Sequence, residues 1–233
     1  MSGLVRRAAA APVVAAVLSV MAVAPTGQAS AGTVAAQWNM NEKAGATVMA
    51  DSSGNNNNGT LHHVTAGVAG APGLGTAYQF GGSAKKSYVE APDSPSLNPG
   101  THPISISLWL KTTKVASSGD YDLVRKGDYP GQEYKVELDG AKEVGPDEIA
   151  CTFHGSHASS NATGGPRLSD GKWHHVICAE SSTAITLTID GVLVKKTTVD
   201  VGSISVTTPV EIGAHPSFDY YSGDLQDVSI AIG

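Results

Sequence analysis

Acidic side chains recur at alternate positions in one run of the sequence, Glu133-Tyr-Lys-Val-Glu137-Leu-Asp139. On a strand, Glu133 and Glu137 would share one face about 13 Å apart, because each residue advances about 3.3 Å. Hydrolysis of a glycosidic bond uses two carboxyl groups roughly 5–9.5 Å apart. Glu137 and Asp139 would be nearer, at about 6.6 Å, but Asp139-Gly140 is typical of a turn and Lys135 occupies the middle of the run. We therefore predict no catalytic residue, and a protein that is not an enzyme.

The run Asp51-Ser-Ser-Gly-Asn-Asn-Asn-Asn-Gly59 combines one carboxylate, several side-chain amides and glycines. Ca²⁺ takes six to eight oxygen ligands from carboxylates, amides and backbone carbonyls. The run therefore suits a structural calcium ion, with Asp51, Asn55 and Asn57 as candidate ligands. The alternative is a loop held by its own hydrogen bonds, because Asp and Asn side chains bond readily to nearby backbone groups.

Three aromatic residues lie in or beside predicted loops, namely Tyr129, Phe218 and Tyr220. Exposed aromatic rings can stack on the faces of sugar rings, while neighbouring polar groups fix the orientation of the sugar. These three residues are therefore the candidates for ligand binding. Each has the alternative of packing in a loop or in the core. Trp109 and Trp173 are expected to pack in the core or between strands.

Histidine pairs at His154/His157 and His174/His175 could suggest zinc. Adjacent residues of a strand point to opposite faces, so His174 and His175 cannot bind one ion together. A catalytic zinc site also needs a third protein ligand, for which the sequence offers no candidate. The serine-hydrolase, zinc-protease and phosphate-loop motifs are absent as well.

The elements that must position these groups are strands. In the segment 104–110, Ile104, Ile106, Leu108 and Leu110 alternate with smaller or polar residues, as in a central strand with one buried face. Asp190-Gly191 predicts a tight hairpin, because both central residues of a type I′ turn need positive φ. Further strands are predicted at 34–41, 46–50, 60–64, 77–80, 87–91, 121–126, 132–138, 148–153, 173–178, 184–189, from 192, 209–212 and 224–232. With no helical periodicity after residue 31, the pattern predicts an all-β fold, a two-sheet antiparallel β-sandwich.

The N-terminus has the pattern of an export signal. Arg6 and Arg7 precede the apolar run 8–23, and Ala29-Ser-Ala31 offers a cleavage site. We predict a signal peptide at 1–31, cleaved after Ala31, and one domain at 32–233 of a secreted protein. The apolar run is shorter than the about 20 residues a spanning helix needs, so no membrane span is expected.

Charge narrows the choice of partner. Residues 32–233 contain 13 basic and 21 acidic residues, a net charge of −8. Nucleic acids and anionic membranes attract clusters of Lys and Arg, and none is visible in the sequence. The composition therefore disfavours a nucleic-acid partner.

Five segments in this order carry a resemblance to a known family. They are the loop 51–61, Tyr78-Gln-Phe-Gly-Gly82, the strand 104–110, Asp170-Gly-Lys-Trp-His-His-Val176 with the hairpin that follows it, and Tyr221-Ser-Gly-Asp-Leu-Gln-Asp-Val-Ser-Ile230. Together they resemble the laminin-G-like domains of the concanavalin A-like lectin and glucanase superfamily, in the form common in secreted bacterial proteins. The resemblance implies a jelly-roll sandwich.

The same resemblance implies two further features. Bacterial members often carry a cysteine pair at this position, so a disulfide between Cys151 and Cys178 is expected, and export allows it to persist. Related sandwiches hold a structural Ca²⁺ where an early loop meets the last strand, and Asp227 matches the acid on that strand. Gln226 replaces a second acid that the family often has there.

The function that the resemblance implies is that of a secreted, non-catalytic binding module, with an extracellular glycan or a glycosylated surface as its partner and calcium as a structural cofactor. The alternative is an adhesive or structural module that binds another secreted protein through a sheet edge or loop rim. A glycoside hydrolase of the same superfamily is the third reading. The fold alone cannot separate them, because one fold hosts many functions.

Overall fold

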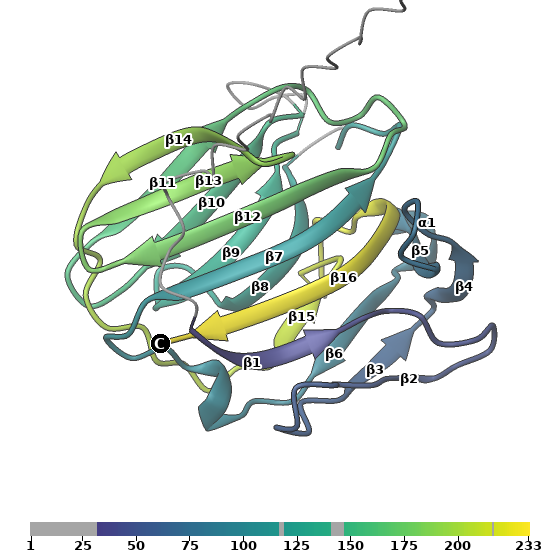
Figure 1. Ribbon diagram of the computed structural model, residues 1–233, viewed down its shortest axis with the longest axis horizontal. Coiled ribbons are helices and arrows are strands. Elements are labelled where there is room, and N and C mark those ends of the chain that lie inside the picture. Colours follow the sequence, from purple (N-terminus) through teal and green to yellow (C-terminus); the bar gives the residue numbers. More distant parts are fainter. Residues whose placement is uncertain (1–31, 117–118, 141–146, 216) are drawn as a thin grey trace, which may run out of the picture.

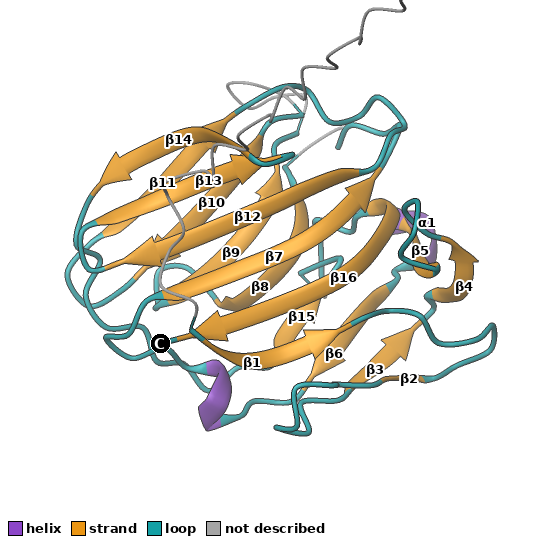
Figure 2. Ribbon diagram, in the orientation of Figure 1, coloured by secondary structure: helices purple, strands orange, loops and turns teal. Residues whose placement is uncertain are grey.

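The computed structural model describes residues 32–116, 119–140, 147–215 and 217–233. The predicted signal peptide, with its cleavage site after Ala31, lies outside these residues. The described chain forms two antiparallel sheets stacked face to face, and Figure 1 shows the first sheet in front of the second. Figure 2 shows how little helix there is, which amounts to α1 (Gly82–Lys85) and the short 3₁₀ turn η1 (Pro95–Leu97). The predicted all-β sandwich is confirmed.

The first sheet has the order β14-β13-β12-β7-β16-β5-β4, with β1 also paired to β16. Its longest strand, β16, pairs with β5 through residues 222–225 and with β1 through residues 228–232. The change of partner coincides with a bulge, where Asp227 has a φ of 53°. The strands of this sheet are β1 (Thr33–Trp38), β4 (Thr65–Ala69), β5 (Thr76–Gly81), β7 (Ile104–Lys111), β12 (His174–Ser181), β13 (Ala184–Ile189), β14 (Val192–Thr198) and β16 (Ser222–Ile232).

The second sheet has the order β11-β10-β9-β8-β15-β6-β3-β2. Its strands are β2 (Val48–Met49), β3 (Gly59–His62), β6 (Tyr88–Ala91), β8 (Tyr121–Gly127), β9 (Glu133–Leu138), β10 (Ile149–His154), β11 (Ser159–Gly164) and β15 (Val210–Ile212). Strands that follow one another in the chain are therefore distributed over both sheets, as a jelly roll requires.

The core lies between the two sheets, and alternation decides which residues enter it. All four apolar residues predicted for the buried face of β7 are buried, while the residues between them are half-exposed. Trp109 is one of the outward residues and stacks on His175 of β12 with ring centroids 4.9 Å apart. Inter-strand packing of Trp109 is thus confirmed.

The Asp190-Gly191 hairpin joins β13 to β14, and both turn residues have positive φ, 51° and 79°. The type I′ prediction is confirmed.

The predicted disulfide is confirmed too: Cys151 of β10 is bonded to Cys178 of β12, with Cα atoms 5.5 Å apart. Because β10 and β12 belong to different sheets, this bond ties the two layers together through the core.

Two strands were missed by the sequence analysis, β4 and β11. Of the six residues of β11, only Ala162 is buried, and the strand lies at the edge of the second sheet. Backbone pairing with β10 holds this polar segment extended. Its side chains carry no alternating apolar signal, since an edge strand can leave most of them in solvent.

Candidate functional site

The outer face of the second sheet carries charged side chains that are buried or nearly so. In β9, Glu133, Lys135 and Glu137 alternate with the core residues of the same strand, so all three face outward. Asp122 and Arg125 of β8 join them, although residues three apart on a regular strand face opposite sides. A β-bulge between Asp122 and Val124 removes that difference by inserting one extra residue.

Arg125 is the centre of one half of this face. Its guanidinium lies 2.8 Å from Asp122, 3.1 Å from Asp128 and 3.5 Å from Glu133. It also donates to the Gly127 carbonyl at 3.0 Å. Buried charges are tolerated when they are paired in this way. The arrangement fixes the end of β8 against the start of β9.

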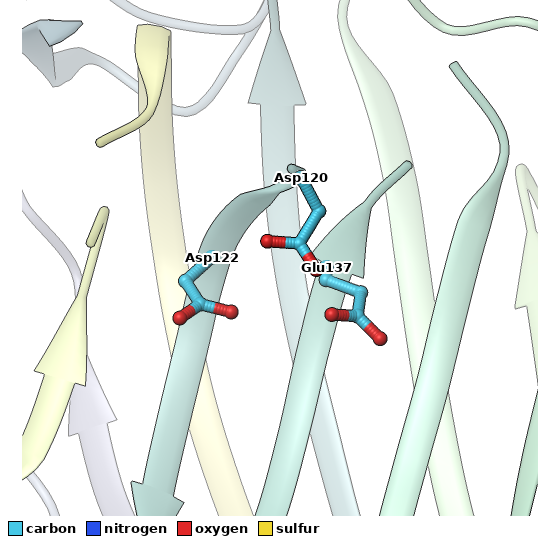
Figure 3. Close-up of side chains that lie close together, drawn as sticks. All are labelled: Asp120, Asp122 and Glu137. Carbon is cyan, nitrogen blue, oxygen red and sulfur yellow. The ribbon is translucent and has the colours of Figure 1, made fainter. Parts of the chain in front are cut away.

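The other half is an acidic cluster, which we define as Asp120, Asp122 and Glu137. Figure 3 shows these three side chains on neighbouring strands, with Asp120 just before the start of β8. One carboxylate oxygen from each lies within 4.8 Å of the others. Lys135 is the nearby cation: its Nζ contacts Glu137, lies 3.6 Å from Asp120 and 4.0 Å from Asp122.

The carboxyl groups of the acidic cluster and the nearby Asp219 shift one another's pKa values. Burial, together with the neighbouring Asp120 carboxylate, raises the pKa of Glu137 well above its usual range. Burial and the charges of Asp120 and Asp122 raise the pKa of Asp219 to about 7. Burial acts to raise the pKa of Asp120 as well, but the hydrogen-bonding interaction with Glu137 and the charge of Lys135 outweigh burial and lower it. Acids in one cluster therefore hold protons with very different strength.

Two open depressions meet at Asp120. One, of about 560 Å³, runs over β9 and β10 and includes Lys135 and Glu137 in its lining. The other, of about 500 Å³, lies beneath the segment before β16 and includes Phe218 and Tyr220. Both are polar hollows on the surface, with aromatic side chains confined to the second.

The three predicted ligand-binding residues are only partly brought together. Phe218 and Tyr220 line the same depression; Phe218 is 51% exposed, whereas Tyr220 is buried. The Phe218 ring stacks on His215, whose Nε2 lies 3.5 Å from Asp128. Tyr129 is 70% exposed and packs near His154 instead, outside the lining of either depression.

The predicted calcium residues gather around β1. The Asp51 carboxylate accepts hydrogen bonds from the backbone N–H groups of Gln37, Ser53 and Asn57, each at 2.9 Å, and from the Ser53 hydroxyl at 2.8 Å. The Gln37 side chain in turn donates to Asp227 at 2.7 Å. The early loop and the last strand therefore do meet, with Gln37 between their two carboxylates.

The amide groups of this loop are also engaged. Asn57 Nδ2 donates to the Ala35 carbonyl at 2.8 Å, and Asn55 Nδ2 donates to the same carbonyl at 3.0 Å. Burial acts to raise the pKa of Asp51, but the hydrogen bonds it accepts outweigh burial and lower it. The loop is thus held by its own hydrogen bonds, and a calcium ion would have to exchange with some of them.

The adjacent histidines His174 and His175 contact different groups. His174 lies between Asp190, at 2.8 Å, and Asp170, at 3.1 Å, while His175 contacts Ser107 Oγ at 2.8 Å. The two adjacent rings thus have separate partners on opposite faces, as predicted.

Sequence reasoning missed Asp120 and Asp122. Their spacing of two, in Asp120-Tyr-Asp122, was a signal that both side chains share a face. Their proximity to Glu137 depended on the pairing of β8 with β9, in which Asp122 lies opposite Glu137. No local pattern specifies that register.

Comparison with known proteins places the chain in a family. The family model of the concanavalin A-like lectin/glucanases superfamily matches residues 80–231. No curated protein sequence matches the chain.

Several solved structures share the fold at low sequence identity. Domain 4 of AbnA, an extracellular arabinanase from Geobacillus stearothermophilus solved with arabinotriose, is 16% identical with a TM-score of 0.65, covering 88% of this chain and 94% of that one. The binding domain of Paraclostridial Mosquitocidal Protein 1 is 16% identical with the same TM-score, covering 85% and 48%. The binding domain of botulinum neurotoxin DC in complex with SialylT is 14% identical with a TM-score of 0.60, again covering 85% and 48%.

The chain spans about half the length of the toxin binding domains and nearly all of the arabinanase domain. The two toxin structures are binding domains, and at such identities all three neighbours show the fold alone. The match of the family model over most of the chain shows more than the fold. The chain belongs to the concanavalin A-like lectin/glucanase superfamily.

Proposed function

We propose that this protein is a secreted, non-catalytic binding module for carbohydrate or a glycosylated surface. The observation that carries the proposal is the pair of depressions that meet at Asp120, one of them lined by Phe218 and Tyr220. Polar groups beside aromatic rings are what sugar recognition uses. Two neighbours of the same fold were solved with arabinotriose and with SialylT, which supports a glycan as the class of ligand.

The charge of the side chains that line the depression over β9 and β10 indicates which class of glycan should bind. Asp120, Glu137, Asp139 and Glu148 line one depression, with Lys135 as a counter-charge. Complementary charge favours a partner and like charge disfavours it. We therefore expect uncharged sugars to bind better than sialylated or sulfated ones.

A glycan array tests the proposal. The wild-type protein should bind a set of neutral glycans, and Phe218→Ala should weaken that binding at least tenfold. Leu193→Ala is the matched control, since Leu193 is an exposed apolar residue on β14, away from the depressions. Tyr129→Ala tests whether the binding surface extends to His154. Absence of glycan binding, or equal loss in the Phe218 and Leu193 variants, would overturn the proposal.

A second candidate is an adhesive module that binds another secreted protein. The observation in its favour is β14, which forms one edge of the first sheet and exposes Val192 and Leu193. An open strand edge can add a strand from a partner. A botulinum neurotoxin DC binding domain of the same fold was solved with rat synaptotagmin II. Val192→Lys or Leu193→Lys should abolish binding of this kind and leave glycan binding intact.

A turnover assay on β-glucans distinguishes hydrolysis from binding, and we expect no product.

Secretion has its own support, because the disulfide suits an oxidising compartment. Among the described residues, no helix is long and apolar enough to span a membrane. Sequencing the N-terminus of the exported protein should give Gly32 as the first residue.

A further inference from the structure

The acidic cluster of Asp120, Asp122 and Glu137 has the geometry of a cation site. One oxygen from each of its three carboxylates lies within 4.8 Å of the other two. Two oxygens bound to one Ca²⁺ lie up to about 4.6–5.2 Å apart, because each Ca–O distance is about 2.3–2.6 Å. Three oxygens with such separations lie at most about 2.8 Å from a common centre, close to the length of a Ca–O bond, so one calcium ion can bind all three after a small adjustment of the side chains.

Two buried oxygens of this cluster, Asp120 Oδ1 and Asp122 Oδ1, have no hydrogen-bond partner among the described residues. The third carboxylate is contacted through its Oε2 atom by Lys135 Nζ. Asp122 is 1% exposed and Glu137 is 7% exposed, so water does not compensate them freely. A buried acceptor without a donor is destabilising, and more so when it is charged. The Asp51 carboxylate shows the contrast, because each of its oxygens accepts two hydrogen bonds.

Lys135 supplies only part of the missing positive charge. Its Nζ contacts Glu137 but stands 3.6 Å from Asp120 and 4.0 Å from Asp122. Arg125 pairs with the other oxygen of Asp122 at 2.8 Å. Lys135 itself lies at good hydrogen-bonding distance from neither aspartate. A divalent ion would bring twice the charge and could contact all three carboxyl groups.

The cluster is open to ions from solvent. Asp120 lines both depressions, and Glu137 lines the one over β9 and β10. An ion held here would keep room for water ligands, which Ca²⁺ needs to complete its six to eight oxygens. Asp122 is buried on the inner side of the site, and the outer side is open to solvent.

We propose that Asp120, Asp122 and Glu137 bind a calcium ion, with Lys135 moving aside as its competitor. This site is separate from the loop of Asp51 and Asp227 and does not depend on whether the protein binds glycans. The hard carboxylate oxygens select Ca²⁺ over softer transition metals.

Calorimetric titration of the purified, metal-free protein with calcium chloride tests the proposal. Asp120→Asn and Glu137→Gln should each weaken calcium binding at this site at least tenfold. Asp200→Asn, which removes an exposed carboxylate that contacts His157 and the Gly202 N–H group, should bind calcium as the wild type does. Asp227→Asn separates the two sites, because it should leave the binding that Glu137→Gln removes.

Lys135→Met supplies a test in the opposite direction. Removal of the competing ammonium should strengthen calcium binding, whereas a cluster that serves only as a salt bridge would gain no calcium affinity. The near-ultraviolet circular dichroism of each variant shows whether it is folded. A wild-type protein that binds no calcium, or Asp120→Asn and Glu137→Gln variants that bind it as Asp200→Asn does, would overturn the proposal.

Discussion

Two acidic regions of this sandwich have opposite surroundings. The Asp51 carboxylate accepts four hydrogen bonds from Gln37, Ser53 and Asn57, and its pKa is lowered although burial acts against this. Glu137 stands beside Asp120 and Asp122, each of which has a buried oxygen without a hydrogen-bond partner in the described part of the chain, and burial raises the pKa of Glu137. Hydrogen-bond donors supplied by the fold stabilise the ionised form of a carboxylate. Where such donors are missing, the carboxylate is stabilised instead by binding a proton or a metal ion.

The largest expected loss of stability comes from removing Arg125, the cation that pairs with Asp122 of the acidic cluster. Arg125→Met removes the partner of Asp122 and Glu133, both of which are buried. Breaking a buried ion pair on one side costs about 3–5 kcal/mol, because a charge remains without compensation. Urea unfolding should show a loss of this size in the free energy of unfolding.

Two controls identify the cause. Lys172→Met removes an exposed cation paired with Asp170 and should leave the unfolding midpoint unchanged. Adding Asp122→Asn and Glu133→Gln to Arg125→Met should restore part of the lost stability. If Arg125→Met alone unfolds no more easily than wild type, the charged half of this face is solvated and the comparison fails.

The second effect is smaller and concerns the saturated region. Asp51→Ala leaves the N–H groups of Gln37, Ser53 and Asn57 without their acceptor. Hydrogen bonds to a charged group contribute about 1.5–3 kcal/mol each when buried, but this loop is partly exposed. We expect a loss of about 2–3 kcal/mol in urea unfolding. Ser52→Ala is the control, because Ser52 makes only an exposed side-chain contact to the Gln37 carbonyl and to Asn39.

The difference between the regions also explains what could be predicted from the sequence. Strand β7, the Asp190-Gly191 hairpin and the Asp51 loop are encoded by neighbouring residues, through alternation, positive φ and Asx-type bonding. The disulfide of Cys151 and Cys178 was predicted through resemblance, since pairing of distant cysteines has no local signal.

The acidic cluster has a different origin. It needs the antiparallel register of β8 with β9 and the bulge after Asp122, neither of which leaves a mark in the residue types. Strand β11 was not predicted for a similar reason: backbone pairing with β10 holds it extended, and its sequence has no apolar alternation. Contacts between residues distant in sequence were thus the part that sequence reasoning could not supply.

The third effect tests the calcium predicted for Asp51, Asn55, Asn57 and Asp227. In a Glu137→Gln background, calcium at 100 times its Kd for the loop should stabilise the protein by about 2.7 kcal/mol, because an ion that binds only the folded state adds its binding energy to stability. Asp227→Asn should erase this gain while its amide oxygen still accepts the bond from Gln37. The measurement is a thermal melt with EDTA and with calcium; coincident curves would leave the loop held by hydrogen bonds alone.

Measured per pH unit, the smallest effect is the pH dependence of stability, and it has opposite sign in the two regions. For Glu137 the folded pKa lies above the ordinary 4.5, so the folded state holds the proton longer and stability falls as pH rises above about 4.5. For Asp51 the folded pKa lies below 3.8, so its contribution is present above that pH and is lost as pH falls below it. One proton changes the free energy of unfolding by at most about 1.4 kcal/mol per pH unit. Urea unfolding from pH 3 to 9, with EDTA present, should show that Glu137→Gln flattens the decline above pH 4.5 and that Asp51→Asn alters only the acid limb. A Glu137→Gln variant with the wild-type slope at neutral pH would mean that Glu137 ionises normally, and the contrast between the two carboxylates would then disappear.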